Sequence, residues 1–170
     1  MANNIGKKFE KDFQSSVPDY VLVYRLKDSA QSFGKSSKLR FSSKNPFDFI
    51  LWDSSKKILY ALELKTVSGK SISFERNKDD HGDIHLHQIE GLNFWNKYDG
   101  TKCGFIVFFR ATETTVFIDI DSFNKLSILL GKKSFNLNDL ESNHLPYVVI
   151  PQKKVRTRYR YNISDFLSKN

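Results

Sequence analysis

Two carboxylates, Asp48 and Glu63, lie in an otherwise apolar stretch of the sequence. Residues 47–65 form two apolar runs around a short Asp, Ser and Lys cluster, a pattern that predicts a β-hairpin. A turn centred on residues 55–56 places Asp48 directly opposite Glu63, and Lys65 follows on the same face because side chains alternate with period two. Like charges facing each other across a strand pair lie about 5 Å apart and destabilise it. A divalent cation such as Mg²⁺ is the simplest group that neutralises them, because it prefers carboxylate ligands.

The chemistry that this pattern supports is metal-dependent attack of water on a phosphate ester. Two carboxylates can hold Mg²⁺, which polarises a phosphoryl oxygen and lowers the pKa of a bound water. The Lys65 ammonium beside them can either position the attacking water or stabilise the charge that develops on the phosphorane. Mn²⁺ is an alternative metal at such oxygen ligands. The sequence contains no glycine-rich phosphate loop, and no small-molecule cofactor is expected.

Each carboxylate also has a purely structural explanation. Asp48 follows an Asn-Pro pair, so it can simply end a turn. Glu63 can face solvent from an edge strand, together with Ala61 and Lys65. In a buried strand, by contrast, an unpaired charge costs several kcal/mol. The combination of Asp48, Glu63 and Lys65 on one face favours the catalytic interpretation.

A helix predicted over residues 3–16 brings a third acidic side chain into consideration. Ile5, Phe9 and Phe13 recur every four residues and form its apolar stripe. Glu10 lies at the border of this stripe. It is a candidate supporting carboxylate at the metal side of the site, and a solvated surface Glu is the alternative.

A second helix is predicted from Asp83, which can cap it, to about Lys97. Gln88 interrupts its apolar stripe, which otherwise consists of Ile84, Leu92 and Trp95. A buried amide is costly unless it finds hydrogen-bond partners. A Gln that faces the site and orients water or a phosphate explains the interruption, as does a core Gln bonded to backbone.

Basic residues are concentrated in two segments of a chain whose formal net charge is +8, and this favours a polyanionic partner. The first segment, residues 25–45, is rich in Ser and lacks periodicity, which predicts a long protruding loop. Its basic residues are Arg25, Lys27, Lys35, Lys38, Arg40 and Lys44. The second segment, residues 153–161, alternates as one strand does, which would place Arg156, Arg158 and Arg160 on one face suited to a row of phosphates. A solvated edge strand is the alternative, but two basic segments together favour DNA or RNA.

The composition predicts a single folded domain, residues 1–170. Of the 170 residues 39% are hydrophobic, and 15 are Phe, so a packed core is expected. No apolar stretch approaches the ~18 residues of a membrane span, and the N-terminus lacks the pattern of a secretory signal. The single Cys103 excludes an internal disulfide and fits a reducing, intracellular setting.

The predicted elements follow one another as a mixed arrangement of helices and strands. Besides the two helices and the hairpin, strands are predicted at 21–26, 103–110, 114–120 and 147–150, and helical segments at 121–131, 138–142 and 165–167. Asp121 is expected to cap the helix that Gly131 ends. This order predicts an α/β fold in which helices flank a mixed β-sheet.

The residues of the hairpin and of the second helix resemble a known nuclease family. Asp48, followed by Glu63-Leu64-Lys65, is similar to the PD-(D/E)XK nuclease signature. Residues 85–90, His-Leu-His-Gln-Ile-Glu, and the strand at 103–110 resemble the RecU-type Holliday junction resolvases of Gram-positive bacteria and their phages. The basic insertion before Asp48 also agrees, as does the N-terminal helix with Gly6, Phe9 and Glu10. The resemblance covers roughly residues 3–120.

This resemblance implies a restriction-endonuclease-like fold and a Mg²⁺-dependent homodimer that resolves four-way DNA junctions by paired nicks in recombination and repair. It implies that Asp48, Glu63 and Lys65 are catalytic and that Glu10 and Gln88 support them. The basic loop would correspond to the family's stalk, which enters the junction centre. A bacterial cytoplasmic or nucleoid location is expected. Two alternatives stay open: a restriction or repair endonuclease that cuts duplex DNA, and a non-catalytic DNA-binding protein.

Overall fold

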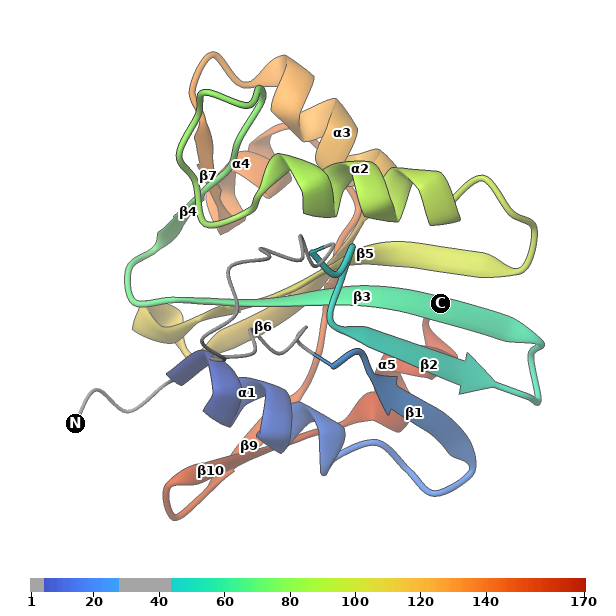
Figure 1. Ribbon diagram of the computed structural model, residues 1–170. Coiled ribbons are helices and arrows are strands. Elements are labelled where there is room, and N and C mark those ends of the chain that lie inside the picture. The colour runs from blue at the N-terminus through green and yellow to red at the C-terminus, as the bar shows by residue number, and fades with distance from the viewer. Residues whose placement is uncertain (1–4, 28–43) are drawn as a thin grey trace, which may run out of the picture.

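A six-stranded mixed sheet forms the centre of the computed structural model, which describes residues 5–27 and 44–170 (Figure 1). Its strand order is β1-β2-β3-β5-β6-β8. Neighbouring strands are antiparallel, except that β3 and β5 are parallel. The strand bounds are β1 Val21–Arg25, β2 Phe49–Asp53, β3 Ile58–Val67, β5 Thr101–Phe109, β6 Thr114–Asp119 and β8 Val148–Val149.

Helices flank both faces of this sheet, as predicted (Figure 1). One face carries α2 (Leu86–Trp95), α3 (Ile120–Leu129) and α4 (Leu137–Ser142), with the small sheet of β4 (Ser71–Ser73) and β7 (Ser134–Asn136). The other face carries α1 (Ile5–Gln14), α5 (Ile163–Ser168) and the hairpin of β9 (Gln152–Val155) and β10 (Arg158–Tyr161). Each face buries its own apolar cluster, and the central strands contribute to both. No helix within the described ranges is long and apolar enough to cross a membrane.

The hairpin has the predicted register. Phe49 pairs with Leu62, and Asp53 pairs with Ile58, so the turn is centred where the sequence places it. β3 lies between β2 and β5, so the edge-strand alternative for Glu63 is wrong. Because β3 and β5 are parallel, the chain between them must cross over the sheet, and α2 lies in this crossover.

The two helices over this face begin at different residues from those predicted. Asp83 does not cap α2, because its carboxylate accepts hydrogen bonds from the backbone N–H (3.2 Å) and the hydroxyl (2.6 Å) of Ser73. The following Ile84 is held in a β-bridge, so the helix begins only at Leu86. In α3 the N-cap is Asp119 instead of Asp121, and the helix ends at Leu129, before Gly131.

The C-terminal basic run is two strands instead of the predicted single one. The chain reverses at residues 156–157, where Arg156 has a φ of 55°, and β9 pairs with β10. Arg156 therefore does not share a strand face with Arg158 and Arg160. The alternation was misleading because the turn contains no Gly, Pro, Asn or Asp that would mark it.

Candidate active site

The hairpin brings Asp48 and Glu63 to the end of the sheet at which β2 begins. The backbone N–H of Asp48 donates to the Leu62 carbonyl oxygen (3.1 Å), which extends the strand ladder by one residue. Asp48 Oδ2 then accepts from the Leu64 N–H (2.9 Å). Glu63 lies on β3 and is 3% exposed. Both carboxylates are thus fixed by the strand pairing itself.

Lys65 and Gln88 both contact Glu63. Lys65 Nζ lies 3.2 Å from Glu63 Oε1, and Gln88 Nε2 donates to the same oxygen at 2.5 Å. The other end of the Gln88 amide, Oε1, accepts from the His85 N–H at the start of α2 (2.9 Å). Gln88 therefore faces the carboxylate pair and uses its backbone bond to hold this orientation. Both explanations offered for a polar residue in this stripe therefore apply: Gln88 faces the site, and it is also bonded to backbone.

Close packing against the residues before Asp48 sets the position of α2. A Cβ at Gly91 would lie 3.0 Å from the Pro46 carbonyl oxygen, so only Gly allows this approach. One turn further along, the Trp95 ring meets Phe47 edge to face, with ring centroids 5.1 Å apart. The helix that carries Gln88 and the segment that leads to Asp48 are thereby held as one unit.

Glu10 and Arg25 form an ion pair at the border of this site. Arg25 Nε donates to Glu10 Oε2 at 2.7 Å, and the Glu10 side chain is 18% exposed. Glu10 is therefore not the freely solvated residue of the alternative interpretation. Its charge acts on both Asp48 and Glu63 and raises their pKa values. Arg25, predicted to contact DNA, lies beside the carboxylates through this pair.

The two carboxylates are held in surroundings that disfavour their charge. Burial raises the pKa of Glu63 to about 8, and the neighbouring charge of Asp48 adds to this, although Lys65 opposes it. Burial also raises the pKa of Asp48 to about 6, against the hydrogen bond from Leu64. Lys65 thus compensates for only part of the cost of holding two anions here, and an added cation would stabilise both.

The donor set fits a cation that keeps several of its waters. Within the described ranges, Asp48 Oδ1 and Glu63 Oε2 make no hydrogen bond, so each carboxylate has one oxygen available to a ligand. No group of three or more His, Cys, Asp or Glu side chains that could hold a metal forms in the same ranges. Mg²⁺ is commonly bound through one or two carboxylates, with waters and substrate oxygens completing its coordination.

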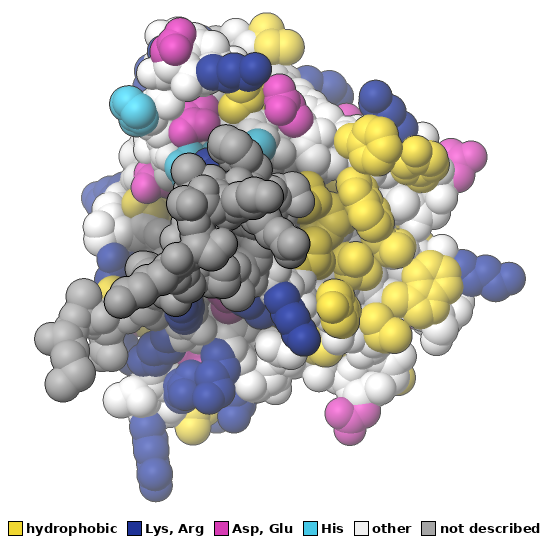
Figure 2. Space-filling view, viewed as in Figure 1, with side chains coloured by type: hydrophobic (Ala, Val, Ile, Leu, Met, Phe, Trp, Pro, Cys, Tyr) yellow, Lys and Arg dark blue, Asp and Glu magenta, His cyan; other side chains and the backbone are white. Residues whose placement is uncertain are grey.

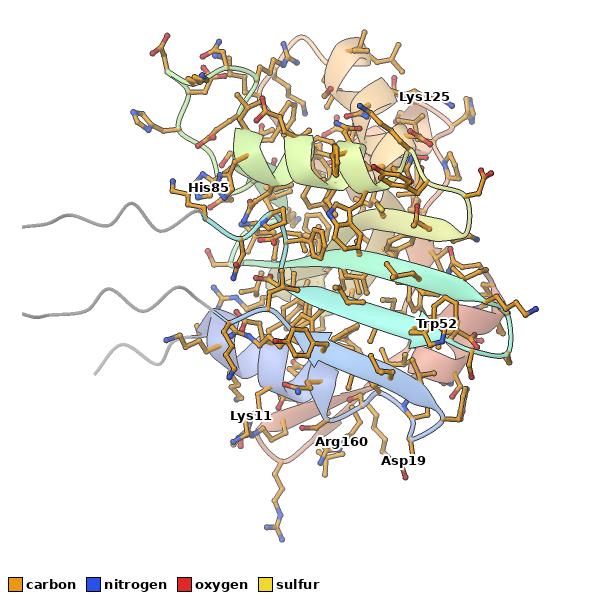
Figure 3. All side chains as sticks on the ribbon, turned by 45° about the vertical axis from the view of Figure 1, so that its right-hand side comes forward. Lys11, Asp19, Trp52, His85, Lys125 and Arg160 are labelled. Atoms are coloured by element: carbon orange, nitrogen blue, oxygen red, sulfur yellow. The ribbon has the colours of Figure 1, made fainter. Side chains whose placement is uncertain are left out.

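His87 is a neighbour of the site for which the sequence predicts no role there. Its pKa is lowered by partial burial and by the nearby charges of Lys44, His85 and Lys65. Its ring stacks on that of His85, with centroids 5.6 Å apart, and His85 Nδ1 lies 2.7 Å from Glu75 Oε1. Figure 3 shows His85 at the same end of the sheet as the start of β2. The position of His87 directly before Gln88 in the sequence is the signal by which it could have been assigned to the site.

The predicted DNA-binding residues lie in three different settings. Lys35, Lys38 and Arg40 are outside the described residues. Lys27 and Lys44 flank that segment, and its two ends lie side by side because Asn45 Nδ2 donates to the Lys27 carbonyl oxygen (2.8 Å). In the C-terminal hairpin Arg156 and Arg160 are exposed, whereas Arg158 Nη1 pairs with the buried Asp12 at 2.8 Å.

Comparison with known proteins gives a match at the level of structure. No protein-family model matches the sequence, and no curated protein matches it. Among solved structures, Hjc, a Holliday junction resolvase of the archaeon Archaeoglobus fulgidus, matches with a TM-score of 0.50 and 11% identity. The match covers 81% of this chain and 93% of that one. The likeness shows that this chain has a restriction-endonuclease-like fold, with its mixed sheet between helices.

Proposed function

We propose that this protein is a Mg²⁺-dependent endonuclease that resolves four-way DNA junctions by paired nicks. The observation that carries the proposal is the pair of the partly buried Asp48 and the buried Glu63, with Lys65 and Gln88 bonded to one oxygen of Glu63. The junction as substrate is supported by the fold that the chain shares with an archaeal junction resolvase. We place this activity in recombination and repair of DNA in the bacterial cytoplasm or nucleoid, in a Gram-positive bacterium or its phage.

Asp48 and Glu63 would hold the metal through Asp48 Oδ1 and Glu63 Oε2. Bound Mg²⁺ would supply polarisation of a phosphoryl oxygen and a lowered pKa for water at the site, which is the chemistry that hydrolysis of a phosphodiester needs. Gln88 keeps the Glu63 carboxylate in one orientation. The Lys65 ammonium, held beside Glu63, either positions the attacking water or offsets the charge that develops on the phosphoryl oxygens.

A panel of DNA substrates tests this function. We expect the wild-type protein with Mg²⁺ to introduce paired nicks in a synthetic four-way junction and to leave a linear duplex of the same sequences uncut. Product strands on denaturing gels measure both reactions. Equal cleavage of duplex and junction would instead assign the protein to duplex-cutting restriction or repair endonucleases. Binding to the panel with no cleavage would mark it as a non-catalytic DNA-binding protein.

An apolar surface beside the site supports the homodimer that paired nicks require. Leu22 and Tyr24 of the edge strand β1 are 57% and 53% exposed. Their side chains lie on the same face of the sheet as those of their pairing partners in β2, Trp52 and Ile50. Phe94 and Tyr98, from α2 and the turn after it, are also exposed. Figure 2 shows hydrophobic side chains, in yellow, gathered into one patch on this side of the molecule. We propose that a second copy of this chain covers the patch. A patch at one sheet edge can pair with the same patch of another copy about a two-fold axis. A four-way junction is itself nearly two-fold symmetric, so such a dimer matches its substrate.

Leu22→Asp tests this dimer surface. A buried charge at a self-paired apolar patch should convert the dimer into a monomer, and the monomer should release singly nicked junctions. Sedimentation measures the first result and product analysis the second. Ile128→Asp is the matched control, because Ile128 is 82% exposed on α3, outside the patch. A wild-type protein that sediments as a monomer would contradict the proposal, as would a Leu22→Asp variant that stays dimeric.

A further inference from the structure

A groove of about 450 Å³ lies on the face of the molecule opposite α2, separate from the carboxylate pair. Its walls are one side of α1, the end of β5 with the turn after it, and the hairpin β9–β10. Four basic side chains line it, from three different places in the sequence: Lys8, Arg110, and Lys154 with Arg156 of the hairpin. Figure 2 shows Lys and Arg side chains gathered over this lower part of the molecule.

The acidic residues of the groove already have partners. Asp12 accepts from Arg158 Nη1 (2.8 Å) and from the Tyr159 N–H (3.0 Å). Glu113 accepts from the Tyr159 hydroxyl (2.8 Å) and from Lys154 Nζ (3.3 Å). The buried Asp12 carboxylate is thus neutralised within the wall of the groove, and the exposed Glu113 carboxylate is paired with Lys154.

The remaining cations have no such partner. Within residues 5–27 and 44–170, Lys8, Arg110 and Arg156 form no ion pair with an acidic side chain. Arg110 Nε is moreover buried and makes no hydrogen bond in the described part of the chain. A buried donor without a partner is costly and uncommon in native proteins. The groove thus holds unmatched positive charge and a guanidinium with bonding capacity left for an anion.

Aromatic rings form the floor below these cations. The rings of Phe108 and Tyr159 have centroids 5.1 Å apart, and Phe9 packs against Phe108 at 5.7 Å. Lys154 Nζ lies 5.7 Å from the centroid of the Tyr159 ring. Rings on which bases stack, combined with cations for the phosphates, are the arrangement by which proteins hold unpaired nucleic acid. A site for a free phosphate has no need of the aromatic floor.

We infer that this groove binds an unpaired segment of one DNA strand of the substrate, at a fixed distance from the scissile phosphate. Lys8, Arg110 and Arg156 take its phosphates, and the partly exposed ring of Tyr159 takes a base, backed by the buried ring of Phe108. The inference rests on the proposed function and adds a strand contact to it. Glu10 borders the carboxylate pair, whereas its neighbour Phe9 lines the groove, so the two sites lie on different sides of α1. The groove and the carboxylate pair are therefore separated by the width of one helix, about 10 Å. A DNA strand spans this distance with about three nucleotides at ~3.4 Å each.

Binding of a labelled thymidine oligomer of about ten nucleotides, a length that covers a typical single-strand site, tests the inference. Fluorescence anisotropy is measured in metal-free buffer over a range of salt concentrations. Two phosphate contacts are lost in the double variant Lys8→Gln/Arg156→Gln, so its affinity should fall roughly tenfold and its log–log salt slope by about 1.4, at about 0.7 per contact to a single strand. Arg110→Gln should lower the slope by about 0.7. Lys125→Gln, which removes one exposed charge on α3 at the far side of the molecule (Figure 3), should match wild type.

The outcomes separate this inference from the proposed nuclease activity. Wild-type affinity and salt slope in the double variant would overturn the groove inference alone, even if the protein cuts junctions. A wild-type protein that binds no oligomer would overturn it as well. Thymidine monophosphate that competes as strongly as the oligomer would show a mononucleotide site and overturn the strand assignment. Groove-dependent binding without cleavage of any DNA would keep the inference and remove the nuclease proposal.

Discussion

Replacing Asp48 by Asn or Glu63 by Gln will abolish Mg²⁺-dependent cleavage of a four-way junction. Each substitution removes one of the two anions that would hold the metal, and cleavage should fall by more than about 10³-fold, beyond the loss of a single stabilising donor. Single-turnover rates at saturating enzyme measure this loss directly. Binding of the junction in metal-free buffer should be retained or strengthened, because each substitution removes a carboxylate that can only repel a polyanion.

Asp53→Asn is the matched control for these variants. Asp53 is a buried carboxylate at the other end of β2, and it accepts hydrogen bonds from the Ser55 N–H (3.0 Å) and the Ser55 hydroxyl (2.6 Å). It is a carboxylate of the same hairpin, buried as Glu63 is, but it pairs with Ile58 at the end of the hairpin away from Glu63. Its variant should keep cleavage while losing some stability. Cleavage at the wild-type rate in Asp48→Asn or Glu63→Gln would reject the assignment of the site.

The metal-free protein will lose stability as the pH rises from about 5 to above 8. The pKa of Glu63 is about 8 in the folded protein, against an ordinary value of 4.5, so the folded state keeps a proton that the unfolded chain releases. This contribution is fully present below the unfolded pKa and is lost as the pH rises through the folded one. Asp48, whose folded pKa is about 6, acts in the same direction over a lower range. The free energy of unfolding should fall by on the order of a few kcal/mol.

Urea unfolding at pH 5 and pH 8.5 in the presence of a chelator measures this effect. In Glu63→Gln the titrating carboxyl is gone, so the difference between the two pH values should shrink to the part that Asp48 supplies. Mg²⁺ added at pH 8.5 should restore stability to the wild type and not to Glu63→Gln, because a ligand stabilises only the folded state that binds it. A wild type that is more stable at pH 8.5 than at pH 5 without metal would contradict the prediction.

The hairpin could be predicted from the sequence because its information is local. A single polar cluster separates two apolar runs, so only one register keeps both runs aligned, and this register brings Asp48 opposite Glu63. Gln88 was identifiable for a similar reason, since it interrupts a helical stripe. Glu63 and Gln88 are each a polar residue at a position where the local pattern predicts an apolar one. In the structure their side chains are hydrogen-bonded to each other.

Other features depend on contacts between distant segments, which no local pattern reveals. The start of α2 depends on the bridge between Phe74 and Ile84, and the small sheet of β4 and β7 was not predicted at all. The partner of Arg25 is Glu10, and that of Arg158 is Asp12, across 146 positions of sequence. The groove residue Arg110 looked like the end of a strand. The sequence therefore predicts which segments are rich in basic residues. It does not predict which of these residues form ion pairs within the protein.

The parallel pairing of β3 with β5 has a consequence for when the site comes into being. The hairpin needs only neighbouring residues to form, but Gln88 reaches Glu63 only after the crossover has closed and β5 has docked beside β3. Non-local pairings of this kind form late, because the entropy of closing a long loop must be met first. A nascent or partly folded chain can therefore carry the paired carboxylates without the amide that orients them. Such a chain should be unable to cut the DNA around it, so competence for cleavage is tied to completion of the fold.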